Sequence, residues 1–131
     1  ANPESMRAAV DNFAGLKPKG KGRKIAILGE MREMGEHAPE VHTELGRAVA
    51  GAGFDQVLFF GPSGTEFAAG MAAGGNSKKP VISDAYEQSL ALKALPVLDE
   101  NDLVLIKGSR GMQLEKALAD LKPVSFETKK A

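Results

Sequence analysis

The stretch Ile25-Ala26-Ile27-Leu28-Gly29 is a short apolar run that ends in a glycine. Such a run is typical of a strand that is buried on both faces of a parallel sheet. Residues 54–61 are expected to form the second strand, residues 81–82 a brief third strand and the apolar run at residues 103–106 the fourth. The sequence therefore predicts four buried strands, and residues 124–126 are expected to add an edge strand.

Helical patterns separate these runs. From Met6 onward apolar residues recur three and four positions apart, and Asn2 suits the N-cap position of that helix. Pro39 opens a second helix, while Asp84 and Glu87 resemble a capping box at the start of a later one. Further helices are expected at residues 65–73, 84–95 and 114–121.

The alternation of strands and helices predicts an α/β fold. We expect a doubly wound, Rossmann-like, mostly parallel sheet of five or six strands with helices on both faces. In the strand order 3-2-1-4-5, the first and fourth strands lie side by side. Their C-terminal loops, residues 30–36 and 108–111, then flank the crevice where folds of this class bind ligands.

The composition is that of one ordinary globular domain covering residues 1–131, with 43% hydrophobic and 26% charged residues. Seventeen basic residues balance seventeen acidic ones, which argues against a nucleic-acid partner. There is no cysteine, apolar run of membrane-spanning length or signal peptide, so we expect a soluble, cytoplasmic protein without a membrane partner. The chain enters a helical pattern at once, without an initiator Met, and we expect it to be part of a longer protein.

Several familiar motifs fail on inspection. Residues 15–21 fit the start of a P-loop, but Gly22 stands where a Ser or Thr must bind magnesium, and the segment follows a helix instead of a strand. His37 and His42 are five positions apart, which does not match a helical metal site. Ser63 lacks the frame of a nucleophile elbow. We therefore assign no metal ligand and no catalytic residue to this chain.

Glu30 is the best placed acidic residue of the loop that follows the first strand. Its carboxylate could take a substrate ammonium or a ribose hydroxyl at the crevice. The alternatives are that Glu30 caps the next helix or pairs with Arg32.

Lys107, Ser109 and Arg110 form the second candidate group, at the end of the fourth strand and the entrance to a helix. Two cations, a hydroxyl and free backbone N–H groups suit a phosphate or a carboxylate. The alternative is a simple turn with Arg110 in water. His42, on the second helix, is a candidate donor or proton carrier if it faces the crevice, and otherwise has a structural role.

Three segments resemble the motifs of one family. Residues 1–9 resemble the end of YNANPxSMxAA, residues 28–36 with His42 resemble LGxMxELGxxxxxxH, and residues 107–115 resemble KGSRGMxLE. Together they resemble the C-terminal, third domain of the MurF-type ligases of the Mur ligase family, which join D-alanyl-D-alanine to UDP-N-acetylmuramoyl-tripeptide in bacterial peptidoglycan synthesis. The family pattern allows Asp at position 30, where this chain has Glu30.

The resemblance implies an ATP-dependent amide-bond former that works through an acyl phosphate. ATP and Mg²⁺ would be bound mainly by a central ATPase domain, which, like the N-terminal domain, would be a partner within the same polypeptide and is absent from this chain. Asn2 and Glu30 would lie on the nucleotide side, while Lys107, Ser109, Arg110 and His42 would lie near the substrates. Alone, the domain is expected to be inactive.

Two other interpretations remain open. The chain could be a free-standing α/β module that binds an anion or a partner without catalysis. It could also be the equivalent domain of a sister Mur ligase that adds a different amino acid.

Overall fold

The computed structural model describes residues 2–75, 78–94, 98, 100–109, 114 and 116. Its elements, in chain order, are α1 (Pro3–Ala14), β1 (Lys24–Gly29), the short 3-10 helix η1 (Gly35–His37), α2 (Ala38–Ala50), β2 (Gln56–Phe60), α3 (Gly64–Ala73), β3 (Val81–Ser83), α4 (Gln88–Ala94) and β4 (Leu103–Lys107).

The described strands form one parallel sheet in the order β3-β2-β1-β4. This confirms the α/β fold and places the first and fourth strands side by side, as expected. The predicted edge strand at residues 124–126 lies outside the described residues, as does the helix expected at residues 114–121 apart from Leu114 and Lys116.

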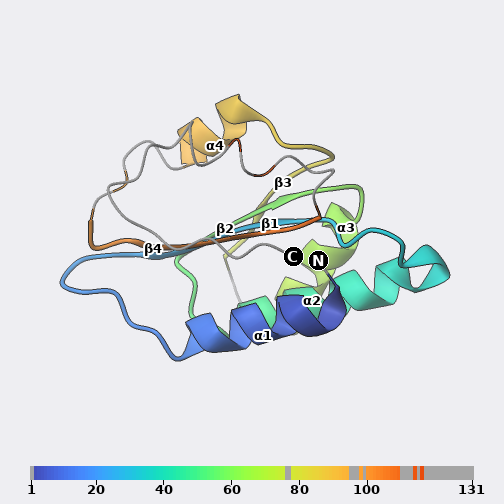
Figure 1. The fold of residues 1–131 in the computed structure, drawn as a ribbon, viewed down its shortest axis with the longest axis horizontal. Helices are drawn as coiled ribbons and strands as arrows, with labels where there is room; N and C mark the ends of the chain where they lie inside the picture. Colours follow the sequence, from blue (N-terminus) through green and yellow to red (C-terminus); the bar gives the residue numbers. More distant parts are fainter. Residues whose placement is uncertain are drawn as a thin grey trace.

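Helices cover both faces of the sheet, with α1, α2 and α3 on one side and α4 on the other (Figure 1). The strand residues alternate accordingly. Ala26 and Leu28 of β1 belong to the cluster beneath α1, α2 and α3, whereas Ile25 and Ile27 belong to the cluster beneath α4. Because both faces are covered, all six residues of β1 are buried, which is why the sequence shows an uninterrupted apolar run.

The helix at residues 65–73 forms in spite of its glycines, because these glycines let α3 approach α2 closely. A Cβ atom added at Gly70 would lie 2.0 Å from the carbonyl oxygen of Thr43, and one added at Gly46 would lie 2.2 Å from that of Phe67. The low helix propensity of glycine is therefore outweighed by packing that a larger residue would prevent.

The capping box predicted from Asp84 and Glu87 is wrong, because α4 begins only at Gln88. The Glu87 carboxylate instead accepts a hydrogen bond of 2.9 Å from the hydroxyl of Ser83, at the end of β3. A side-chain bond to the preceding strand thus replaces the local cap.

Candidate functional site

The C-terminal loops of β1 and β4 meet at the predicted crevice. The backbone N–H of Ser109 donates to the carbonyl oxygen of Glu30 at 3.2 Å, and the backbone N–H of Arg32 donates to Ser109 Oγ at 3.0 Å. A Cβ atom added at Gly108 would lie 3.0 Å from the Cα atom of Gly29, so glycine permits this approach. The expectation that the loops after β1 and β4 lie together is confirmed, while their sharing of a ligand crevice stays a prediction.

The Glu30 side chain is almost fully buried and is held by Ser63, the residue before α3. Glu30 Oε1 accepts the backbone N–H of Ser63 at 2.9 Å, and Glu30 Oε2 accepts the Ser63 hydroxyl at 2.6 Å. Glu30 therefore supports the start of α3, and not of the next helix, α2, as one of the alternatives held. Within the described residues it makes no ion pair with Arg32.

Room for this carboxylate comes from Gly61, at the end of β2. A Cβ atom at this position would lie 2.7 Å from Glu30 Cβ and 2.8 Å from Glu30 Oε1. Neither Gly61 nor Ser63 was singled out as part of a site from the sequence. The turn-like segment 61–64 was visible there, but its proximity to Glu30 follows from the pairing of β1 with β2.

His42 lies beneath the same loop with its ring fully buried. Its Nε2 atom accepts the backbone N–H of Met31 at 3.0 Å, and its Nδ1 atom lies 2.7 Å from the carbonyl oxygen of Ala38. Since an N–H donor fixes Nε2 as an acceptor, the proton is on Nδ1 and the ring is neutral. The geometry thus gives His42 a structural role in holding Met31, and its contact with substrate stays a prediction.

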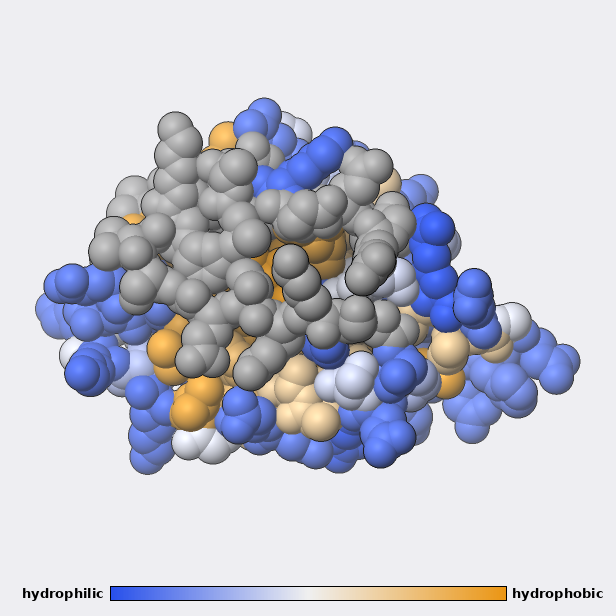
Figure 2. Space-filling view, in the orientation of Figure 1, coloured by the Kyte–Doolittle hydropathy of each residue, from blue (hydrophilic) through white to orange (hydrophobic). Residues whose placement is uncertain are grey.

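A groove of about 420 Å³ opens above Glu30. The surface over this loop and the start of α2, at the right of the view, is hydrophilic (Figure 2). Glu33 and Gly35 adopt left-handed backbone conformations, with φ angles of 63° and 55°, which turn the loop around the groove. The lining residues are Glu30, Met31, Arg32, Glu33, Met34, Gly35, Ala38 and Pro62.

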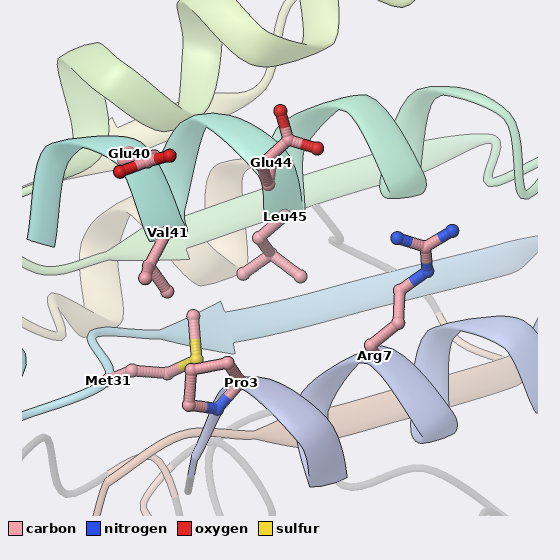
Figure 3. Close-up of a pocket in the computed structure, with 7 residues that line it drawn as sticks. All are labelled: Pro3, Arg7, Met31, Glu40, Val41, Glu44 and Leu45. Carbon is pink, nitrogen blue, oxygen red and sulfur yellow. The ribbon is translucent and has the colours of Figure 1, made fainter. Parts of the chain in front are cut away.

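A second, smaller groove of about 270 Å³ lies between α1 and α2 (Figure 3). Met31 and Pro3 line one side of it, while Val41 and Leu45 point into it from α2 (Figure 3). Since Met31 lines both grooves, they adjoin through this residue.

The remaining predicted site residues lie at the start of α1 and at the end of β4. Asn2 is the N-cap of α1, as predicted, and its Oδ1 atom accepts the backbone N–H of Ser5 at 2.8 Å. Lys107 is buried at the end of β4, and Ser109 is buried where the two loops meet. Arg110 lies outside the described residues. Contacts of these residues with ligands stay predictions.

The described part of the chain has neither a metal-binding cluster nor a membrane-spanning helix. No group of three or more His, Cys, Asp or Glu side chains there is arranged to hold a metal ion. None of the helices found there has the length and apolar character needed to span a bilayer.

A parallel sheet with helices on both faces, and with the loops after β1 and β4 in contact, defines a Rossmann-like α/β domain. The family model described as "Mur ligase, glutamate ligase domain" matches residues 1–110. The chain belongs to this family of Mur ligase C-terminal domains.

Individual relatives agree with the family. The chain is similar to the UDP-N-acetylmuramoyl-tripeptide–D-alanyl-D-alanine ligases of Bacillus subtilis (34% identity over 122 residues, 92% of this chain and 26% of that protein) and Treponema pallidum (34% over 118 residues, 88% and 24%). It also resembles the crystal structure of the Thermotoga maritima MurF ligase in complex with ADP, with a TM-score of 0.71, 26% identity, and coverage of 93% of this chain and 26% of that chain. The chain thus spans about a quarter of the length of these relatives.

Proposed function

We propose that this chain is the C-terminal domain of an ATP-dependent ligase that joins D-alanyl-D-alanine to UDP-N-acetylmuramoyl-tripeptide. The observation that carries the proposal is the contact between the loops after β1 and β4, in a chain similar over most of its length to ligases named for this reaction. The ADP bound to the similar Thermotoga maritima enzyme supports the use of ATP. The single-domain organisation, its domain partners and a cytoplasmic location belong to the same proposal.

ATP would convert the tripeptide carboxylate to an acyl phosphate, and the amine of D-alanyl-D-alanine would attack it and release phosphate. This domain would bring the amine partner to the reaction by closing over the other domains, which excludes water and aligns the reacting groups. Within this chain, Asn2 would contact the nucleotide, Glu30 the nucleotide or the incoming amine, and Lys107 with Ser109 the phosphates or the acceptor carboxylate. Mg²⁺ would be held mainly by the central domain, as the family resemblance implies.

The test compares the complete enzyme encoded by the gene with the 131-residue chain alone. Formation of the amide product is followed by mass spectrometry, with ATP, the UDP-linked tripeptide and D-alanyl-D-alanine as substrates. We expect ligation by the complete enzyme and none by the isolated chain. Ligation by the isolated chain would contradict the third-domain assignment, and ligation of a different amino acid in place of the dipeptide would identify a sister ligase. Absence of any ATP-dependent ligation would favour a non-catalytic module.

Arg110 is proposed to bind the carboxylate of the dipeptide, because a guanidinium can hold a carboxylate through two parallel hydrogen bonds. Replacing Arg110 with Ala in the complete enzyme should raise the KM for D-alanyl-D-alanine by about tenfold or more, the loss expected for a charge-assisted hydrogen bond. Steady-state kinetics measure this change, and an unchanged KM and kcat would remove Arg110 from the site.

A further inference from the structure

Ser63 holds both oxygens of the Glu30 carboxylate at once. Its backbone N–H lies 2.9 Å from Oε1, and its hydroxyl lies 2.6 Å from Oε2. A carboxylate bound at both oxygens by one residue cannot rotate without losing a bond, so Ser63 fixes the plane of the group. Both residues are buried, which makes loss of either bond unfavourable.

The position of Ser63 in the chain explains why it can do this. It is the N-cap residue of α3, yet its side chain makes no capping bond within the helix. Its hydroxyl serves Glu30 instead, a residue 33 positions away in the sequence. The N-terminus of α3 also favours a negative charge, because the helix dipole is positive there. This arrangement supplies hydrogen-bond donors to both oxygens of the buried side chain.

The carboxylate is nevertheless available to a ligand. About four acceptor sites exist on a carboxylate, and Ser63 occupies two of them. The side chain is 11% exposed and lines the groove of about 420 Å³. The nearest basic group among the described residues, His42, lies 3.7 Å away and is neutral, because its Nε2 atom accepts the N–H of Met31. Glu33 and one cation, Arg32, also line this groove, so its two carboxylates outnumber its one basic side chain. This balance of charge favours a cationic ligand.

We propose that Ser63 is a positioning residue for Glu30, and that the carboxylate it orients binds the ammonium group of the amine substrate. This inference rests on the proposed function, in which D-alanyl-D-alanine enters from this domain. The competing ligand is a ribose hydroxyl of the nucleotide, which also donates hydrogen bonds but carries no charge.

Glu30→Gln in the complete enzyme distinguishes the two ligands. The amide keeps the shape and a carbonyl acceptor but loses the charge. We expect the KM for D-alanyl-D-alanine to rise about tenfold or more, as when a charged hydrogen bond is lost, while the KM for ATP stays unchanged. A rise in the KM for ATP alone would overturn the assignment of the ammonium and favour the ribose.

Ser63→Ala tests the positioning role. It removes one bond to Glu30 and should raise the KM for the dipeptide with little change in the KM for ATP. Ser63→Thr, which keeps the hydroxyl, should restore the wild-type value, and Ser63→Cys, a near-isosteric but weak donor, replaces the alanine variant if that one does not fold. The matched control is Ser83→Ala, since Ser83 donates a similar bond of 2.9 Å to Glu87 at an exposed site outside the groove.

The double variant separates an action through Glu30 from a general structural effect. In the Glu30→Gln background, Ser63→Ala should change the KM for the dipeptide far less than it does in the wild type. An equal effect in both backgrounds, or none in either, would overturn the positioning role. Ligation by the wild-type enzyme tests the proposed function separately. If the wild type ligates and the Glu30 and Ser63 variants have the same KM values as the wild type, the proposed function stands and the roles of Glu30 and Ser63 are overturned.

Discussion

Gly61 is the residue whose replacement would most directly disturb Glu30. A Cβ atom there would lie 2.7 Å from Glu30 Cβ, closer than packed carbon atoms approach each other. Gly61→Ala should therefore lower the free energy of unfolding by about 1–3 kcal/mol, the usual effect of overpacking, as measured by urea denaturation.

The control for Gly61→Ala is Gly15→Ala. A Cβ atom at Gly15 would lie 3.8 Å from its nearest neighbour, the carbonyl oxygen of Asn12, and the backbone there has an ordinary φ angle of −86°. This variant should be neutral or more stable by up to about 1 kcal/mol, because alanine restricts the unfolded chain. Equal stability of the two variants would contradict the steric argument at Gly61.

Lys24 is a buried basic residue at the start of β1, so it lies at the opposite end of the strands from the loops after β1 and β4. Burial lowers the pKa of Lys24 below its ordinary value of 10.5, while attraction to the carboxylate of Asp55 opposes this effect. Its Nζ atom donates to the carbonyl oxygen of Ala52 at 2.7 Å. Because the folded pKa is the lower one, the unfolded chain binds more protons in the interval between the two values. The contribution of Lys24 to the free energy of unfolding must therefore increase as the pH rises toward 10.5.

Lys24→Met isolates this contribution. As the pH rises from neutral toward 10.5, the free energy of unfolding of the wild type should increase relative to that of the variant. Loss of the bond to Ala52 adds an offset that does not depend on pH. Chemical denaturation across this range measures the trend, and a difference that stays flat or falls would show that the pKa is not lowered.

The close packing of α2 against α3 depends on glycine at the point where the two helices cross. A Cβ atom at Gly70 would lie 2.0 Å from the backbone oxygen of Thr43, so the two helices would have to separate. Gly70→Ala should lower the free energy of unfolding by about 3 kcal/mol or more, at the upper end of overpacking effects. Thermal and urea denaturation measure the loss.

Gly51→Ala, at the end of α2, is the matched control for Gly70→Ala. Its Cβ atom would lie 3.9 Å from the nearest atom, the carbonyl oxygen of Ala48, and the φ angle is −88°. We expect little change in stability. If Gly70→Ala were as stable as Gly51→Ala, the steric argument for the close crossing would be contradicted.

The elements show which parts of the fold are readable from the sequence. The strands were predictable because burial on both faces requires continuous apolar runs such as residues 25–29. The start of α4 was mispredicted because Asp84 and Glu87 have the spacing of a local cap, whereas Ser83, at the end of β3, competes for the Glu87 carboxylate. A bond that depends on where a strand ends cannot be deduced from local spacing.

The same reasoning applies to the candidate site in the whole molecule. The meeting of the loops after β1 and β4 was expected for the strand order 3-2-1-4-5, which is one of the orders that alternating strands and helices adopt. The link from Glu30 to Ser63 could not be read this way, because it depends on side-chain directions at the ends of β1 and β2. Topology thus predicts which loops meet, while the particular hydrogen bonds require coordinates.

Because the strands are parallel, all of them start at one end of the sheet and finish at the other, and the two ends have different roles. The loops after β1 and β4 lie at the C-terminal end of the strands, about one strand length, or 20 Å, from their N-terminal end. At the N-terminal end of the strands, buried Asp102 accepts hydrogen bonds from the backbone N–H of Arg23 at 2.8 Å and from its guanidinium Nη2 at 3.1 Å. These two bonds join the starts of β1 and β4. Since the pair contacts neither groove, its contribution should be to stability alone.

Asp102→Ala tests this division of roles in the complete enzyme. Loss of the charged hydrogen bonds to Arg23 should lower the free energy of unfolding by about 2 kcal/mol, while the guanidinium, with a side chain 39% exposed, remains hydrated. At a temperature where the variant is folded, the KM for D-alanyl-D-alanine should equal that of the wild type. Denaturation and steady-state kinetics measure the two quantities on the same preparation. A raised KM without a loss of stability would contradict this division and would show that the N-terminal ends of the strands affect substrate binding.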